Sequence, residues 1–198
     1  MDISAPEFQA NSHIPIDLLV SKAHCGLTCG GGGGDGLRFT DSSGNLVFRV
    51  ELLQSDKSTH KRVLLDASAN PLIFIYRNNN GSWQAFKGDN REEKDLICRV
   101  ERTMNSLSGT EFDVSIVGEN GEESKSDFKM KGSPFYRSCT IYKGNSIVAQ
   151  TSLTYKLGIQ GVFMWRNRFR LTIFPGFVDH ALIVALIGIF FDGRKLWI

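Results

Sequence analysis

Hydrophobic and polar residues alternate along many short segments of this chain. In Glu111–Ile116 and in Arg168–Ile173 every second residue is apolar, and Asp127–Lys131 has the same pattern. Alternation with a period of two places apolar side chains on one face of a β-strand and polar side chains on the other. These segments are therefore predicted to be strands with one buried face and one face in water.

Segments rich in Val, Ile, Leu and Phe, each bounded by turn residues, predict about twelve strands. The predicted strands are Ile16–Val20, Leu37–Thr40, Leu46–Leu53, Arg62–Asp66, Leu72–Arg77, Trp83–Lys87, Asp95–Arg102, Glu111–Val117, Ser126–Lys131, Arg137–Lys143, Ile147–Tyr155 and Arg168–Phe174. The spacing of the turns favours an all-β sandwich or barrel. Two turns with a shared pattern, DSSGN from Asp41 and DASAN from Asp66, predict hairpins of a meander.

One segment near the end of the chain predicts a helix instead. Ala181–Phe191 has no polar side chain, Asp179 before it is a suitable N-cap, and Asp192-Gly193 after it is a suitable stop. Its length as a helix would be about 17 Å, at about 1.5 Å per residue, whereas a bilayer needs about 20 apolar residues. We therefore expect a helix near residues 180–191 that is too short to span a membrane.

A helix that is apolar on all sides has to be surrounded by protein. Burial contributes about 1.5–3 kcal/mol for each large apolar side chain, so we expect this helix in the core. Two packed sheets about 10 Å apart leave no space for it, whereas a barrel of about twelve strands does. The expected core residues of the helix are Leu182, Ile183, Leu186, Ile187 and Phe190. A membrane-inserting tail and an interface with a partner are the alternatives.

The predicted fold is thus mainly β: a closed antiparallel barrel of about twelve strands around a central hydrophobic C-terminal helix. Residues 1–15 are polar, contain Pro6 and Pro15, and are predicted to form a flexible N-terminal arm. Residues 16–198 are expected to form a single domain, because this length suits one hydrophobic core.

The charge and the N-terminal sequence limit the classes of function. A net charge of +2 over 198 residues gives no long-range field that would attract nucleic acid. The first residues lack the basic and apolar regions of a secretory signal. We expect an intracellular monomer, in the cytoplasm, in the nucleus or peripherally at the plasma membrane, whose four cysteines are free thiols.

Few arrangements of residues in the sequence suggest catalysis or metal binding. His24, Cys25 and Cys29 lack a second pair of ligands at matching spacing. Gly30–Gly36 is followed by an apparent strand rather than by the Lys and helix of a phosphate loop, and is interpreted as a flexible hairpin tip. The nucleophile motif G-x-S-x-G is absent. We therefore expect no cofactor, no metal and no enzymatic activity, with a hydrolase as an alternative.

Several blocks of the sequence resemble the plant LURP-one-related family. They are DLLVSKAHCGLTCG (17–30), FTDSSGNLVFRV (39–50), LLDASANPLI (64–73), KGDNREEKDLICRV (87–100), MKGSPFYRSCTIYKG (130–144) and VDHALIVALI (178–187), in the order typical of the family. The resemblance implies a fold similar to the C-terminal domain of tubby, a barrel around a hydrophobic helix. It also implies a relation to phospholipid scramblases and to tubby-like membrane-tethered transcription factors, and a role in plant defence. It implies no established biochemical activity.

Basic residues on the predicted strands suggest a surface for a phosphoinositide head group or for a protein partner. The candidates are Lys129, Lys131, Arg137 and Lys143 in one group, and Arg166, Arg168 and Arg170 beside Trp165 in another. Lys129 and Lys131 are expected on one face, and nearby acidic residues, among them Asp127, would weaken the field. The alternative interpretation is an ordinary solvated face of a sheet.

The stretch Leu157–Asn167 is interpreted as an unusually apolar loop. Phe163, Met164 and Trp165 within it could enter a membrane, bind a partner or cover one end of the barrel.

Overall fold

The computed structural model describes residues 14–23, 36–55, 59–106, 109–118, 127–158, 161–176 and 179–192. Its strands are β1 (Ile16–Ala23), β2 (Gly36–Thr40), β3 (Leu46–Ser55), β4 (Thr59–Asp66), β5 (Pro71–Arg77), β6 (Trp83–Phe86), β7 (Leu96–Asn105), β8 (Thr110–Ile116), β9 (Phe128–Ser133), β10 (Ser138–Lys143), β11 (Ser146–Gly158) and β12 (Gly161–Ile173). A short 3₁₀ helix (Glu93–Asp95) precedes β7, and helix α1 (His180–Asp192) follows β12.

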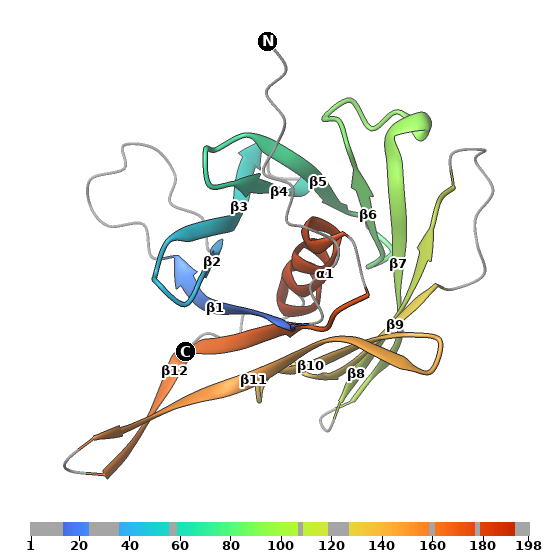
Figure 1. Ribbon diagram of the computed structural model, residues 1–198. Helices are drawn as coiled ribbons and strands as arrows, with labels where there is room; N and C mark the ends of the chain where they lie inside the picture. Colours follow the sequence, from blue (N-terminus) through green and yellow to red (C-terminus); the bar gives the residue numbers. More distant parts are fainter. Residues whose placement is uncertain are drawn as a thin grey trace.

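The strands form one closed antiparallel barrel (Figure 1). Each strand pairs with the next one in the sequence, and β1 pairs with β12 to close the barrel, with Ile16 opposite Ile173 and Leu18 opposite Leu171. The predicted mainly β fold of about twelve strands is confirmed. Of the predicted arm, residues 1–13 lie outside the described part of the chain, and β1 begins at Ile16 as expected.

The interpretation of Leu157–Asn167 as a loop is wrong, because this stretch belongs to two paired strands. β11 continues to Gly158 and β12 begins at Gly161, so that Leu157 faces Val162 in a long hairpin. An apolar stretch suits a strand better than a loop, since pairing satisfies the backbone polar groups. Phe163, Met164 and Trp165 therefore lie on a strand, and their side chains are outside the described part of the structure.

Helix α1 lies inside the barrel, as the sequence predicts (Figure 1). All five predicted core residues of the helix are at most 5% exposed. The backbone amide of Leu182 donates a hydrogen bond of 2.9 Å to the Asp179 carboxylate, which confirms the predicted N-cap. In the described part of the chain, no helix has both the length and the apolar character needed to cross a bilayer.

The core consists of α1 and the inward-facing side chains of the strands. Phe190 packs edge-to-face on Phe112 with 5.6 Å between ring centroids, and Phe112 contacts Trp83 in the same way at 5.4 Å. Gly188 brings the helix close to β3, since a Cβ at this position would lie 3.4 Å from the methyl groups of Val50. Cys98 and Cys139 are buried free thiols in this core, as predicted.

The direction of α1 defines the two ends of the barrel. We call them the His180 end, where the helix begins, and the Asp192 end, where it stops. At the Asp192 end Arg62 forms an ion pair with the Asp192 carboxylate, and the indole of Trp83 lies 3.4 Å from that carboxylate. Because neighbouring strands are antiparallel, the turns after β5, β7 and β9 lie at the Asp192 end.

Replacing Leu186 by Ala should lower the free energy of unfolding by about 2–5 kcal/mol, because it leaves a cavity between helix and sheet. The measurement is urea denaturation followed by circular dichroism. Ile147→Ala is the control, since Ile147 is 44% exposed and its truncation should change stability by about 0.5 kcal/mol or less. Equal effects of the two substitutions would contradict a central position of α1.

Candidate functional site

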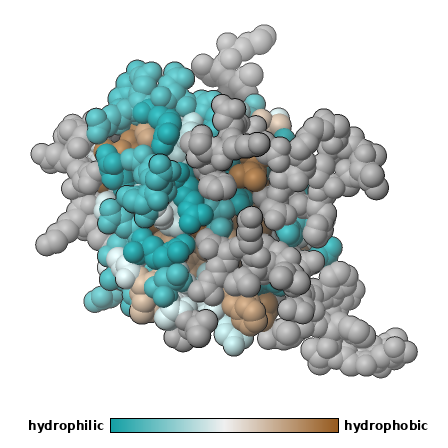
Figure 2. All heavy atoms as spheres, turned by 180° about the vertical axis from the view of Figure 1, so that it is seen from behind, coloured by the Kyte–Doolittle hydropathy of each residue, from teal (hydrophilic) through white to brown (hydrophobic). Residues whose placement is uncertain are grey.

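The inward positions of the strands pack on α1, so groups that could meet a ligand lie on the outer face and at the two ends of the barrel. Over the described residues, the face turned away from the viewer in Figure 1 is mostly hydrophilic, and its hydrophobic atoms form small, separate patches (Figure 2). A broad apolar docking surface is therefore not a feature of this face where it is described.

The first predicted basic group includes two lysines on the outer face of β9. Lys129 and Lys131 are exposed on the same face, as predicted. Each faces an acidic residue of β8: the Lys129 amine lies 3.5 Å from Asp113 and the Lys131 amine lies 3.2 Å from Glu111. The two lysines thus belong to a ladder of paired opposite charges, which leaves little net positive field.

The other two residues of this group lie apart from each other, at opposite ends of β10. Arg137 is in the turn before the strand, where its carbonyl accepts a hydrogen bond from Thr151, and Lys143 is the last residue of the strand. The amine of Lys143 lies 5.6 Å from the centre of the Phe128 ring. The structure therefore does not bring the first basic group together as one patch.

The second basic group is extended by residues that the sequence reasoning missed. Arg168 and Arg170 are exposed on the outer face of β12, whereas the side chain of Arg166 is outside the described part. Ser21 of β1 faces Arg168 on one side and Arg38 of β2 on the other. Since neighbouring strands are about 4.8 Å apart, the backbones at Arg38 and Arg168 are about 10 Å apart across β1.

We call Arg168, Arg38 and Arg49 the arginine row, because Arg49 of β3 in turn faces Arg38. Arg49 contacts Glu51 at 3.2 Å, while Arg38 is exposed and has no ion-pair partner among the described residues. Each member occupies an outward position next to a buried apolar residue, and that parity can be read from the sequence. Their alignment depends on the pairing of β1 with both β2 and β12, which the sequence does not reveal.

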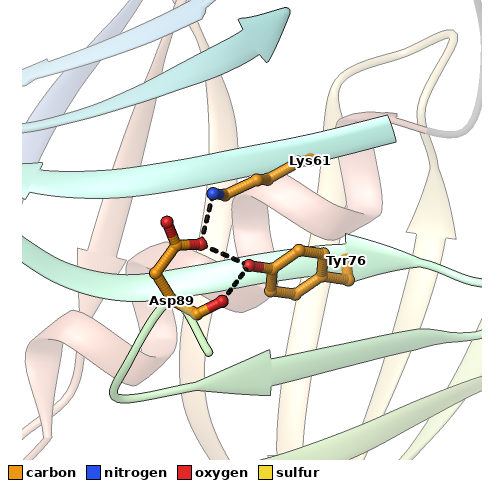
Figure 3. A network of polar contacts seen from close by, with 3 residues as sticks. All are labelled: Lys61, Tyr76 and Asp89. Atoms are coloured by element: carbon orange, nitrogen blue, oxygen red, sulfur yellow. Dashed lines mark hydrogen bonds and ion pairs between the residues drawn. The ribbon is translucent and has the colours of Figure 1, made fainter. Parts of the chain in front are cut away.

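A second polar cluster joins three segments on the outside of β4 and β5 (Figure 3). The Tyr76 hydroxyl lies 2.5 Å from the Asp89 carboxylate and 2.8 Å from the Asp89 carbonyl, and Lys61 forms an ion pair with the same carboxylate. The guanidinium of Arg91 lies 4.3 Å from the centre of the Tyr76 ring. Tyr76 also packs on Phe86 in a small second hydrophobic cluster.

The electrostatics of this cluster favour a structural clamp over a catalytic group. Burial, and next the hydrogen bond to Asp89, raise the pKa of the Tyr76 phenol well above its ordinary value, so the phenol remains protonated. The hydrogen bonds from Lys61 and then Tyr76 lower the pKa of Asp89. The cluster thus fastens the segment after β6 to β4 and β5. Sequence reasoning missed it because Lys61 and Asp89 are 28 residues apart.

The described thiols are poorly suited to nucleophilic chemistry. Burial, with a smaller effect of Asp179, raises the pKa of Cys98 to about 12, and burial raises the pKa of Cys139 as well. Burial lowers the pKa of His180. Within the described ranges, no group of three or more His, Cys, Asp or Glu side chains could hold a metal ion. His24, Cys25, Cys29 and Gly30–Asp35 lie outside these ranges.

Comparison with known sequences gives a consistent result over most of the chain. Residues 28–192 match the sequence profile of the family described as LURP-one-related. The chain is 46% identical to protein LURP-one-related 7 of Arabidopsis thaliana over 188 residues, which is 95% of each protein. It is 34% identical to protein LURP-one-related 15 of the same plant, over 91% of this chain and 81% of that protein.

A solved structure supports the same relationship. The X-ray structure of a protein from Arabidopsis thaliana matches 91% of this chain and 91% of its own, with 30% identity and a TM-score of 0.61. Sequence and structure comparisons therefore agree on one set of relatives.

The contacts of Asp89 with Lys61 and Tyr76 should make a pH-dependent contribution to the stability of the fold. Because the pKa of Asp89 is lower in the folded state, its carboxylate stabilises the fold above its unfolded pKa of about 3.9, and this contribution is lost as the pH falls through the folded value. Asp89→Asn should lower the free energy of unfolding by about 0.5–1.5 kcal/mol at neutral pH, because the carboxylate is partly exposed. The difference from the unsubstituted protein should disappear in acid.

Urea denaturation over a pH series measures this effect. Glu93→Gln is the matched control: it lies in the same segment and contacts Arg99 at 3.6 Å, but its side chain is 89% exposed. A stability difference for Asp89→Asn that persists unchanged below the folded pKa of Asp89 would contradict the clamp.

Proposed function

The chain belongs to the LURP-one-related family, whose biochemical activity is not established, and we propose that it is a binding module without catalytic activity. The support for this proposal is the character of the reactive groups. The described thiols are buried in the protonated form, the Tyr76 phenol is held protonated, and Lys61 is paired with Asp89. A catalytic site instead needs accessible groups whose pKa values are shifted toward the working pH.

We propose further that the ligand is a phosphate group of an anionic lipid head group, bound at the arginine row. The observation that carries this proposal is the position of Arg38, which has no ion-pair partner among the described residues and faces Arg168 across the small side chain of Ser21. Guanidinium groups bind phosphate oxygens in a bidentate geometry. The lysines of β9, in contrast, are paired with acidic residues of β8.

Lipid binding at the arginine row would agree with what the family resemblance implies. Phosphoinositide binding by a barrel surface would be consistent with the implied relation to tubby-like and scramblase proteins, and with peripheral attachment to the plasma membrane. Plant defence, which the resemblance also implies, would then involve recruitment of this module to a membrane. A protein partner at the same surface is the alternative, and the lipid experiment below distinguishes the two.

Replacing both Arg38 and Arg168 by Gln should reduce binding to vesicles that contain phosphatidylinositol phosphates by at least about tenfold, since each lost contact near the surface is worth about 1 kcal/mol. Sedimentation with vesicles at low ionic strength measures this effect, because surface electrostatics is strongest there. Free inositol phosphates should compete if the head group alone is recognised.

The matched control replaces Lys129 and Lys131 by Gln and removes the same formal charge. These lysines are already paired, so we expect less than about a threefold change, a difference well below 1.4 kcal/mol. Greater loss in the control than in the arginine variant would assign the lipid site to β9 instead. Failure of the unsubstituted protein to bind any anionic vesicle would reject lipid as the ligand of the arginine row.

The absence of catalysis is tested separately. A screen against ester and phosphate-ester substrates should give no turnover above that of the heat-denatured protein. Robust turnover that is lost on substitution of a single side chain would overturn the proposal and favour a hydrolase.

A further inference from the structure

The turn between β9 and β10 holds two aromatic side chains in water. Phe135 is 57% exposed and Tyr136 is 62% exposed, and their rings pack edge-to-face with 5.1 Å between centroids. Exposing one such ring forgoes the stabilisation that burial would provide, and here two neighbouring rings do so. The pair lies at the Asp192 end of the barrel, at the tip of a hairpin.

The turn that carries these rings is fixed in place by several contacts. The amide of Ser133 donates a hydrogen bond of 3.2 Å to the Ser138 hydroxyl, and the Arg137 amide lies 3.3 Å from the Pro134 carbonyl. On the β10 side of the turn, the Thr151 hydroxyl donates a hydrogen bond of 2.8 Å to the Arg137 carbonyl and accepts one of 2.7 Å from the Cys139 amide. The rings are therefore presented by a defined backbone and not by a loose one.

Gly132 shows how closely this hairpin is built. A Cβ at this position would lie 2.1 Å from the Ser138 carbonyl oxygen, so only glycine allows the two strands to approach as they do. The close approach of the strands at Gly132 therefore fixes the same turn that leaves Phe135 and Tyr136 exposed. This combination points to a surface that is completed by a binding partner.

The neighbouring hairpin adds a third apolar group at the same end. Met104 of β7 is 43% exposed, and Gly109, which follows the β7–β8 turn, lies between the Met104 methyl group and Gly132. A Cβ on Gly109 would be 3.8 Å from the Met104 methyl and 3.6 Å from the Gly132 carbonyl oxygen. Two adjacent hairpin tips therefore both expose large apolar side chains.

From this geometry we infer that the β9–β10 turn enters the interfacial region of a lipid bilayer, with Phe135 and Tyr136 as the inserted side chains. The inference rests on the proposed lipid function but assigns a different site from the arginine row. Two exposed rings in a hairpin turn can enter a bilayer surface, whereas a protein partner would have to provide a matching pocket. Aromatic side chains are favoured at the level of the lipid head groups.

The charges beside the rings also fit a bilayer with anionic lipids. Arg137 follows Tyr136 directly in the turn, and its φ of 51° places it in the left-handed region at the end of the turn. A cation beside inserted aromatic rings adds attraction to lipid phosphates without having to leave the head-group layer. The Tyr136 hydroxyl would likewise remain among polar head groups while its ring is buried.

The test is the double variant Phe135→Ala, Tyr136→Ala in the full chain, with vesicles of phosphatidylcholine and phosphatidylserine. We expect its apparent partition coefficient to fall at least about tenfold relative to the unsubstituted protein. Its thermal unfolding should be unchanged, because both side chains are exposed. Ile147→Ala is the matched control, since Ile147 is 44% exposed in the turn region at the opposite end of the barrel, and it should bind as the unsubstituted protein does.

A second measurement reports insertion directly. In Tyr136→Trp, the added indole should show a blue-shifted emission with vesicles and should be quenched by brominated lipid chains, relative to the unsubstituted protein. An added emission that keeps the wavelength of indole in water in the presence of bound vesicles would overturn the inference.

The outcomes separate this inference from the proposed function. If the Arg38, Arg168 variant loses binding and the Phe135, Tyr136 variant keeps it, the insertion site is wrong and the arginine row stands. If only the Phe135, Tyr136 variant loses binding, the insertion site stands and the arginine row is rejected as the lipid site. If the unsubstituted protein binds no vesicles, both the arginine row as a lipid site and the insertion of the β9–β10 turn are rejected.

Discussion

The fold depends on one requirement: an α-helix without a polar face has to be shielded from water along its whole length. Ten consecutive residues of α1, Leu182 to Phe191, are buried, which no single sheet face could achieve. Closure of the sheet by β1 and β12 provides a wall on all sides of the helix. At the two ends of the helix, the Asp179 carboxylate accepts a hydrogen bond from the Leu182 amide, and the Asp192 carboxylate contacts Arg62 and Trp83.

Because helix α1 and apolar side chains fill the interior, the charged residues of the strands lie on the outer surface. They form several different local arrangements there. On β8 and β9, acidic and basic residues face each other in pairs. On β12, β1 and β2, arginines face a serine instead. Around β4 and β5, a lysine and a tyrosine share one carboxylate (Figure 3). One part of the barrel wall therefore carries paired opposite charges that largely cancel, whereas another part carries arginines on neighbouring strands.

The architecture could be predicted from the sequence, because alternation identifies strands and the uniformly apolar Ala181–Phe191 identifies a buried helix. The start of β12 could not, because the apolar residues near Phe163 do not alternate, and only their pairing with β11 defines them as strand. The site residues were harder still. Lys129 and Lys131 were correctly placed on one face, but their acidic partners on β8 and the alignment of Arg38 with Arg168 follow from register, which local patterns do not encode.

The order of elements along the chain has a consequence for synthesis on the ribosome. The helix that fills the barrel is the last described element, and β12, which closes the barrel on β1, directly precedes it. A nascent chain that has emerged only as far as β11 therefore has a sheet with two open edges and an uncovered apolar interior. Such a chain cannot reach its final packing one hairpin after another. The core forms only once β12 and α1 have also emerged, and until then chaperones can protect the exposed strands from aggregation.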